Sequence, residues 1–554
     1  MELNKIFNTL SLAAVALIAT ACNDTDAQYS IPAVGAPEFV SITPDADRAL
    51  VFGDKTITVK FDKNINFATK DVTKITLNGT PVKKALVLGV SNELTIYADV
   101  SFDKSQTLVI PAGLIRGPQG DAYDKEINVT WSIKDRSSLP AAALAMTEKL
   151  GWGWNLGNHF DTSDMTWGYW DGQTTIDATL FTKLAAAGVK TVRIPTTWTN
   201  HIKEGTGKSD ENPLEWADAG YLDEVASVVD KAISAGLNVV LNTHHDSFET
   251  DLAYATNNPV TAKEDSTLIA QLWSAIATRF KDYGDKLIFE TFNEVHGGDD
   301  WTKGSEAQFK MLNNWHQYAV DAIRKTGGNN ATRWIGISGY AASIDKTVDY
   351  LELPKKLNSE TETDDHIIVA AHSYDPGGFA QNPYDAKADS LKVYTWGHNA
   401  NKYSVSNTNE DYLLNLLYKL RTKFIENGIP CYLGEFGCVY VDPNNVKHNV
   451  EAVNAYKEFN DFRRYYLEFF CRSANLAGIP IFYWDNNVID NSQQINNDGK
   501  PYISECFGLF NHANGEYLGD AAEIVPMMIK ACTSTDSSYD FPTIWNKSPL
   551  STPK

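Results

Sequence analysis

The stretch LIFETFNE at residues 287–294 is a short apolar run that ends in amide and acidic side chains. A second stretch, PCYLGEFG at residues 430–437, has the same form and carries Glu435 near its end. A carboxyl group at the end of a buried strand adds little stability, whereas in a barrel of parallel strands functional sites are built at this end. We therefore predict that Glu294 and Glu435 face one cleft.

From Gly151 onward the chain alternates between strand-like runs and amphipathic helices, for instance helices at 221–235, 268–283, 309–325 and 412–427. Apolar residues between 225 and 233 recur at the spacing of one helix face. Polar residues close eight strand-like runs, at 155–158, 192–195, 239–244, 292–294, 335–338, 371–374, 433–435 and 482–485. This pattern predicts an α/β fold, a (β/α)8 barrel over residues 151–554. An open doubly wound sheet is disfavoured because no glycine-rich phosphate turn follows the first strand.

Residues 37–134 instead show short alternating runs separated by turn residues, as in TITVKF at 56–61 and ELTIY at 93–97. This period of two predicts a small all-β sandwich that is similar to bacterial immunoglobulin-like domains. Either a rigid spacer or a carbohydrate-binding module fits the segment, and the absence of clustered aromatic residues favours the spacer. Residues 135–150 are expected to form a helical connector.

The first residues have the form of an export signal. Lys5 precedes an apolar run at 10–18 that is too short to span a bilayer, and ATAC follows at 19–22. The ending resembles a bacterial lipobox, which predicts a signal peptide at 1–21, lipidation of Cys22 and a flexible tether at 22–36. The alternative is an ordinary signal peptide cut near Ala21. We expect the protein on the cell surface or outer membrane, with the lipid anchor as its only membrane contact and the catalytic domain facing the extracellular side or the periplasm.

The composition excludes some classes of partner. A formal charge of −22 and a pI near 4.9 argue against nucleic acid, whose phosphates require a basic surface, but do not repel a neutral polysaccharide. The five cysteines after Cys22 are odd in number and form no CxxC pair, so neither a disulfide framework nor a zinc knuckle is indicated. We expect a monomer.

Several motifs occur together in the predicted barrel. They are Arg193 in VRIP, His244 in NTHHD, Asn293-Glu294, His372-x-Tyr374, Glu435 and Trp484. In this order they resemble glycoside hydrolase family 5, a family of retaining glycosidases on (β/α)8 barrels. The opening GWNLGNH at 153–159 is similar to that of the bacterial endoglucanase subfamily, although many members have threonine where His159 stands.

The resemblance implies a role for each residue. Glu435 is expected to be the nucleophile and Glu294 the acid/base, two carboxyls roughly 5 Å apart across one sugar. Supporting or substrate-binding roles are expected for Arg193, His244, His245, Asn293, His372, Tyr374, Trp484, Asn155 and Trp154. Among these, Asn293 suits the sugar 2-hydroxyl and Trp484 offers a flat face to the sugar ring. Glu290 is ambiguous and is expected deeper in the barrel.

No cofactor and no metal are expected. The HHD sequence at 244–246 suggests a metal site with His372, but adjacent histidines on a strand point to opposite faces and cannot share one ion. Five tryptophans, at positions 154, 167, 170, 198 and 396, fall in the opening segment or in loops after strands. As a group they favour an extended cleft and cleavage within a chain.

The expected activity is endo-acting, retaining hydrolysis of β-1,4-glucan. Xyloglucan or mixed-linkage β-glucan remain alternative substrates, and mannan or xylan are disfavoured. An alternative of another class is a catalytically silent glycan-binding lipoprotein on the same barrel.

Overall fold

The computed structural model describes residues 33–44, 56–97, 105–132, 136, 139–164, 168–249, 251–385, 390–442, 450–489, 506–536, 538–539 and 541–551. The predicted signal peptide, Cys22 and Trp167 lie outside these residues. By internal contacts the chain divides into two compact units. The first contains the described residues up to Thr130 except Ser105 and Gln106, and the second contains those two residues and the chain from Trp131 onward.

The first unit is all-β, which confirms the predicted fold class. One sheet has the strand order β1 (Phe39–Thr43), β2 (Thr56–Phe61), β7 (Glu93–Tyr97) and β6 (Lys84–Leu86). The other has the order β10 (Ile127–Ser132), β8 (Ser105–Ile110), β4 (Thr76–Leu77) and β5 (Thr80–Pro81), and β3 (Asn66–Phe67) pairs with β9 (Ile115–Arg116). Alternate residues of β2 are fully buried, as expected of a strand with one face on the core.

The second unit is a closed barrel of eight strands in sequence order, as predicted. They are β11 (Trp152–Asn155), β12 (Thr191–Ile194), β13 (Asn238–Asn242), β14 (Leu287–Glu290), β15 (Ile335–Ser343), β16 (Ile367–Ser373), β19 (Cys431–Phe436) and β20 (Ile481–Tyr483). Every neighbouring pair is parallel, so all carboxyl ends meet at one mouth.

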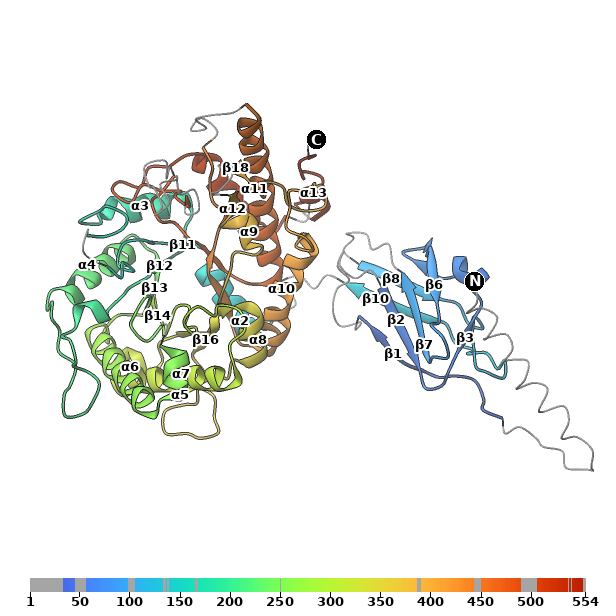
Figure 1. The fold of residues 1–554 in the computed structure, drawn as a ribbon, viewed down its shortest axis with the longest axis horizontal. Helices are drawn as coiled ribbons and strands as arrows, with labels where there is room; N and C mark the ends of the chain where they lie inside the picture. The colour runs from blue at the N-terminus through green and yellow to red at the C-terminus, as the bar shows by residue number, and fades with distance from the viewer. Residues whose placement is uncertain are drawn as a thin grey trace, which may run out of the picture. The chain divides into compact units, whose positions relative to one another are not determined.

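Helices surround the strands (Figure 1). They are α3 (Ala178–Ala187), α4 (Tyr221–Ser234), α5 (Leu252–Asn257), α6 (Pro259–Arg279), α7 (Glu306–Lys325), α8 (Ile344–Tyr350), α9 (Gly377–Ala380), α10 (Glu410–Lys423), α11 (Val450–Ala477), α12 (Ala521–Thr533) and α13 (Phe541–Trp545). Helix α6 begins nine residues before the predicted start, because the Asn258 side chain caps its first turn and Pro259 occupies the first helical position.

The inward side chains of the barrel form layers. The lower layers are apolar and contain Val240, Ile288, Ile368, Ala370 and Phe482, with the ring of Tyr432. Inward positions recur every second residue along a strand, so the next layer up contains Asn242, Glu290 and His372. Arg193 and Asn155 join this polar layer through their hydrogen bonds. The barrel interior therefore changes from apolar to charged over two residues along each of these strands.

Helix α2 (Ala141–Leu150) closes the barrel from below. Its Met146 and Leu150 belong to the same buried cluster as the lower layers, and Thr147 donates a hydrogen bond to the Gly478 carbonyl at 2.7 Å. The helix expected as a connector is therefore the floor of the barrel.

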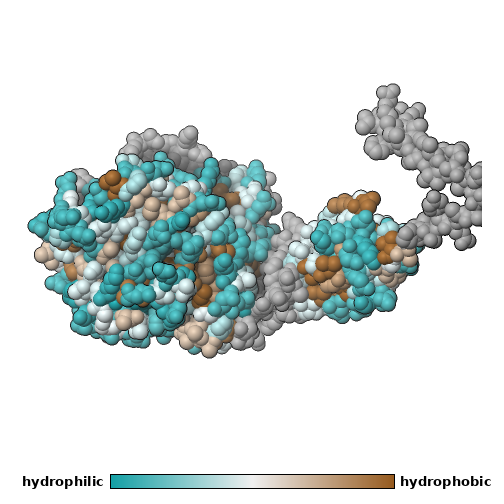
Figure 2. Space-filling view, turned by 90° about the horizontal axis from the view of Figure 1, so that it is seen from below, coloured by the Kyte–Doolittle hydropathy of each residue, from teal (hydrophilic) through white to brown (hydrophobic). Residues whose placement is uncertain are grey.

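Figure 2 shows a largely hydrophilic face on the barrel unit with scattered hydrophobic patches. Among the described residues, no helix combines the length and the apolar character needed to cross a membrane.

Candidate active site

Glu435 reaches the mouth of the barrel through an irregularity in β19. Ala371 pairs with Leu433, but the next residue of β16, His372, pairs with Glu435, so Gly434 is an extra residue in the ladder. A Cβ at position 434 would lie 2.9 Å from His372 Nε2 and 3.4 Å from Arg193 Nε. Only glycine fits this close approach, and the register shift sets Glu435 beside the inward-facing His372.

Glu294 lies in the loop after β14, which ends at Glu290 and is four residues shorter than the sequence suggested. Its Oε1 lies 2.7 Å from His372 Nδ1. One carboxylate oxygen of Glu294, one of Glu435 and one ring nitrogen of His372 all lie within 4.8 Å of one another. The structure therefore brings the two predicted glutamates together across a narrow gap.

Arg193 is the charged centre beneath this pair. Its side chain is completely buried; Nη1 donates to Glu435 Oε1 at 2.8 Å and Nη2 donates to Asn293 Oδ1 at 2.8 Å. Nη1 also donates to Asn155 Oδ1 at 3.0 Å. A planar guanidinium satisfies several acceptors in fixed directions, which fixes the Glu435 carboxylate.

Glu290 balances the buried arginine. It accepts hydrogen bonds from Arg193 Nη2 at 2.7 Å, from Asn242 Nδ2 at 2.9 Å and from the Tyr432 hydroxyl at 2.5 Å. Burial raises the pKa of Glu290, but Arg193 outweighs burial, and the pKa lies below its usual value. The sequence analysis did not single out Asn242 or Tyr432, although their shared inward position with Glu290 was a usable signal.

Tyr374 and His372 complete the surroundings of the carboxylates. The Tyr374 hydroxyl donates to Glu435 Oε2 at 2.8 Å, and burial together with both glutamates raises its pKa well above 10, so it stays a neutral donor. Burial lowers the pKa of His372, but Glu435 and Glu294 outweigh burial and raise it above its usual value. His372 thus favours the protonated form beside Glu294.

His244 faces Trp484, with ring planes 9° apart and centroids 5.9 Å apart. Asn242 Nδ2 lies 3.3 Å from His244 Nδ1, and the orientation of this amide is fixed because its Oδ1 accepts from Thr196 N and its Nδ2 donates to Glu290. Burial lowers the pKa of His244 well below its usual value. The imidazole is therefore neutral, accepts at Nδ1 and carries its proton on Nε2.

The expectation that His244 and His245 diverge is wrong. Strand β13 ends at Asn242, so strand alternation does not apply to the loop, and the two rings meet edge to face at 4.4 Å. With one oxygen of Asp161 their nitrogens lie within 4.8 Å of one another. A proton on His244 Nε2 nevertheless opposes metal binding by that nitrogen.

Asn293 and His245 are both held by Glu249, which the sequence analysis missed. Asn293 Nδ2 donates to Glu249 Oε1 at 3.1 Å, and His245 Nδ1 lies 2.9 Å from Glu249 Oε2. Burial lowers the pKa of His245, but Glu249 outweighs burial and raises it to about 9. Asn293 thus lies between Arg193 and Glu249, which fixes its amide plane.

Two predicted residues support the site from below and do not face the cleft. Trp154 is completely buried and its Nε1 donates to Asp485 Oδ2 at 2.7 Å, so it anchors the turn after Trp484 and offers no platform to a sugar. Asn155 is also completely buried and donates to the Gly434 carbonyl at 2.9 Å. It therefore ties β11 to the irregular point of β19.

Three further residues that the sequence analysis singled out are also buried. Trp198 and Trp396 are fully buried, and His159 is buried with Nδ1 3.1 Å from Asp171. Aromatic residues in loops over a barrel pack into the layer between loops and helices as readily as they line a cleft.

Among the tryptophans that the structure describes, two are exposed. Trp170 is 43% exposed and lies 6.1 Å from His245, which continues the row of rings from Trp484 and His244. Trp301, which the sequence analysis did not single out, is 48% exposed and stacks on His296 at 3.7 Å. His296 Nδ1 in turn lies 2.6 Å from the Glu294 carbonyl, so Trp301 is linked through His296 to the backbone at Glu294.

A closed barrel with two carboxyls at its mouth, a buried arginine below them and aromatic rings beside them defines a glycosidase. The family model described as cellulase (glycosyl hydrolase family 5) matches residues 154–490. This chain belongs to glycosyl hydrolase family 5, and its barrel is of the cellulase-type endoglucanase kind.

Relatives agree with this assignment. The chain is 32% identical to Endoglucanase A of Clostridium longisporum over 67% of its own length and 63% of that protein's length. Among solved structures it is similar to a Bacteroidetes-affiliated family 5 cellulase linked with a polysaccharide utilization locus, with a TM-score of 0.61, 30% identity, and coverage of 75% of this chain and 99% of that chain. A broad-specificity endoglucanase from Bacteroides salanitronis gives a TM-score of 0.58 and 35% identity, with coverage of 71% and 94%.

Proposed function

We propose that the chain is an endo-acting β-1,4-glucanase that cleaves its substrate by double displacement with net retention. The observation that carries this proposal is the gap between the two glutamates, whose nearest carboxylate oxygens lie within 4.8 Å of each other. Retaining enzymes hold their carboxyls about 5 Å apart, whereas inverting enzymes leave roughly 6.5–9.5 Å for a water molecule.

The surroundings of each carboxyl support its role. Glu435 accepts from Arg193 and Tyr374, so it is the ionised group that attacks the anomeric carbon and forms the glycosyl ester. Glu294 is the more exposed of the two, with 20% of its side chain accessible against 7% for Glu435. It gives a proton to the leaving oxygen, and then takes a proton from the water that hydrolyses the ester.

The neighbouring side chains act on the sugar between the carboxyls. His244 offers its Nε2–H, Asn293 its second amide hydrogen, and Trp484 a partly exposed ring face. Hydrogen bonds that strengthen as positive charge develops on the ring lower the barrier more than they tighten ground-state binding.

Cleavage within a chain is supported by two exposed tryptophans in the loops near the two carboxylates. Trp170 extends the row of rings on the His245 side, and Trp301 lies on the Glu294 side. Exposed rings beyond the residues that contact the carboxylates offer additional faces to the sugar units of a long chain. Xyloglucan and mixed-linkage β-glucan remain alternative substrates on the same chemistry.

The test is product analysis on carboxymethylcellulose, mixed-linkage β-glucan, xyloglucan, mannan and xylan. We expect a fast fall in viscosity with few reducing ends and retained anomeric configuration in the first products. Inverted products would refute the double displacement, and no release from any β-glucan would favour the silent glycan-binding protein. Trp170→Ala and Trp301→Ala should raise KM for long substrates more than for cellotriose.

We further propose that the protein is lipidated at Cys22 and held at the cell surface as a monomer. The support is the lipobox-like sequence at residues 19–22 alone. Detergent-phase partitioning of the native protein, lost in Cys22→Ser, is the expected result. Equal partitioning of both proteins into the aqueous phase would refute the anchor.

A further inference from the structure

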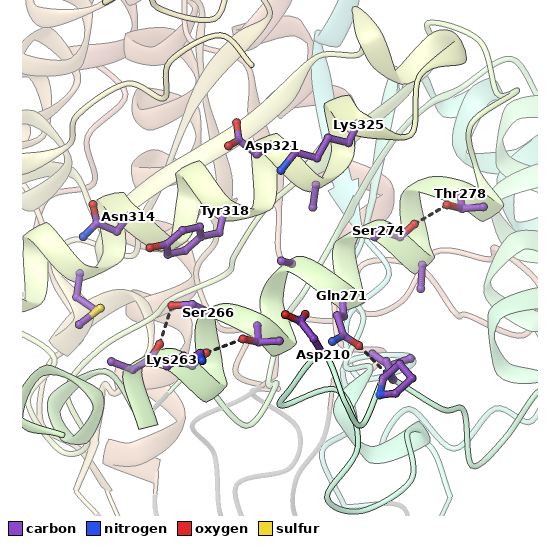
Figure 3. Close-up of a pocket in the computed structure, with 18 of the residues that line it drawn as sticks. Asp210, Lys263, Ser266, Gln271, Ser274, Thr278, Asn314, Tyr318, Asp321 and Lys325 are labelled. Carbon is purple, nitrogen blue, oxygen red and sulfur yellow. Dashed lines mark hydrogen bonds between the residues drawn. The ribbon is translucent and has the colours of Figure 1, made fainter. Parts of the chain in front are cut away.

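A groove of about 980 Å³ runs along the outside of the barrel between α6, α7 and the loop that precedes α4. Figure 3 shows Tyr318, Asn314 and Lys325 on one side of it and Ser266, Gln271 and Ser274 on the other. The active-site residues do not line this groove. We propose that it is a second binding site for a neutral β-glucan chain, an inference that rests on the proposed substrate class.

The groove exists because α6 presents small residues toward it. Ala262, Ser266, Ala270, Ser274 and Thr278 follow one another at intervals of four, which places them on one helix face. At a rise of 1.5 Å per residue this face is about 24 Å long. The depression is therefore elongated and parallel to the helix axis, a shape that suits a polymer chain better than a compact ligand.

The groove is preformed. Gln271 Oε1 accepts from Leu214 N at 2.7 Å, and Gln271 Nε2 donates to the Ser209 carbonyl at 3.2 Å, which fixes the loop against α6. Trp216 on this loop packs edge to face on Trp198, with centroids 6.3 Å apart. A site whose walls are already held in position loses little conformational entropy on binding.

The lining combines ring faces with groups that bond to hydroxyls. Tyr318 is 45% exposed, and neither its hydroxyl nor the side chains of Asn314 and Lys325 form a hydrogen bond or ion pair within the described residues. The hydroxyls of Ser266 and Thr278 donate to helix carbonyls at 2.6 and 2.7 Å, so their oxygens remain free to accept. Aromatic faces for C–H groups beside donors and acceptors for hydroxyls are what a pyranose requires.

Charge favours a neutral occupant. Lys263 and Lys325 are balanced by Asp210 and Asp321 around the groove, whereas the whole chain carries −22. A second copy of the chain brings the same large negative charge, and its approach is opposed by repulsion. A neutral polysaccharide pays no such penalty.

The position of the groove connects it to catalysis. Helix α6 precedes and α7 follows β14, and the loop between β14 and α7 carries Glu294. In this fold the helices begin at the mouth of the barrel, so the groove starts near the rim sector of Glu294. A glucan chain held there keeps the enzyme on its polymer between cleavage events.

The experiment measures affinity of the full chain for hydroxyethylcellulose, a neutral soluble β-1,4-glucan, by gel electrophoresis with the polymer in the gel. Glu435→Gln serves as the background, so that the polymer is not degraded. Adding Tyr318→Ala should weaken binding about tenfold, and Tyr318→Phe should leave it unchanged because the ring face remains. Ser274→Arg, at an exposed position, should fill the groove and weaken binding to the same extent.

Tyr517→Ala is the matched control, because Tyr517 is 40% exposed and lies outside the groove. Suppose that Tyr318→Ala and Ser274→Arg both bind the polymer with unchanged affinity while the wild type hydrolyses cellotetraose. That result would refute glucan binding in the groove and would leave the proposed function unaffected. Absence of hydrolysis together with Tyr318-dependent binding would overturn the function and leave the groove. A dimer in sedimentation that Ser274→Arg dissociates would assign the groove to a second copy and refute the proposal.

Discussion

Replacing Glu290 with glutamine removes one negative charge from the fully buried layer under the catalytic pair. Glu290 lies 2.7 Å from Arg193 Nη2 and contacts no position that a substrate reaches. The substitution keeps the shape of the side chain, but it sets an amide against groups that now donate to a carboxylate. Glu290→Gln therefore tests how much the Arg193–Glu290 ion pair contributes to stability and to catalysis without altering a residue that contacts the substrate.

The loss of stability follows from burial. Breaking a buried ion pair by removing one partner costs about 3–5 kcal/mol. Arg193 keeps Glu435 as a counter-ion at 2.8 Å, so the lower value, about 3 kcal/mol, applies. The barrel unit from Trp131 to Lys554 has an unfolding entropy of about 0.9 kcal/mol per degree, and its melting temperature should fall by about 3 °C.

The loss of activity follows from the shared arginine. With Glu290 neutral, the guanidinium shifts toward Glu435 and draws the carboxylate and Asn293 out of register. A displacement of about 1 Å at a reacting group costs about 100-fold in rate. We expect kcat on cellotetraose to fall by about tenfold to 100-fold while KM changes less, because Trp170 and Trp301 are untouched and the contact of Asn293 with the sugar strengthens mainly in the transition state.

The assay is initial-rate kinetics at saturating and limiting substrate, with differential scanning calorimetry on the same preparations. Tyr432→Phe is the matched control, since it removes one hydrogen bond to Glu290 and leaves the charge. It should lose less stability and less activity than Glu290→Gln. A glutamine variant with the kcat and melting temperature of the wild type would refute the view that Glu290 holds Arg193 in position.

Three further outcomes are expected. Glu435→Ala should lower turnover by several orders of magnitude and keep the circular dichroism spectrum of the wild type; retained turnover would contradict its assignment as nucleophile. Burial lowers the pKa of His512, but Asp171 and Asp485 raise it to about 9, so its contribution to stability is fully present below about pH 6.5 and lost as pH rises through about 9. Thermal scans between these limits should show a fall in melting temperature that His512→Gln reduces, and identical profiles would exclude this origin. Dialysis against EDTA should leave hydrolysis unchanged, and a complete loss restored by a divalent metal would show that an ion is needed.

The strand ends were predictable because parallel strands impose a simple rule. Each strand ends in polar residues at the same mouth, and this pattern was enough to bring Glu294 and Glu435 together from positions 141 residues apart. The start of α6 was less clear, because its first two turns contain few large apolar residues and only the Asn258 cap and Pro259 mark the first turn. Periodicity therefore predicts which elements exist better than where they begin.

The predicted roles of side chains were wrong where burial depends on how segments distant in the sequence pack together. Trp154 and His159 belong to the opening segment that carries the family resemblance, yet both are buried. Trp154 lies in β11 and packs on Phe510 and His512, and the His159 ring packs on Tyr169. The alternation of side chains along a strand predicted that His245 points away from His244. Strand β13 ends at Asn242, three residues before His245, so the alternation does not extend to this residue. Glu249 and Trp301 were missed because nothing local in a single sequence marks a loop residue that a distant segment holds.

The floor of the barrel determines how the protein can be dissected. Met146 and Leu150 of α2 form one buried cluster with six inward-facing strand residues, among them Val240 and Ile288. A truncated catalytic fragment that started at Gly151 would expose this apolar ring to water and lose its lower seal. A fragment beginning before Leu139 keeps the seal, so the shortest self-sufficient enzyme is longer than the barrel strands and outer helices alone suggest.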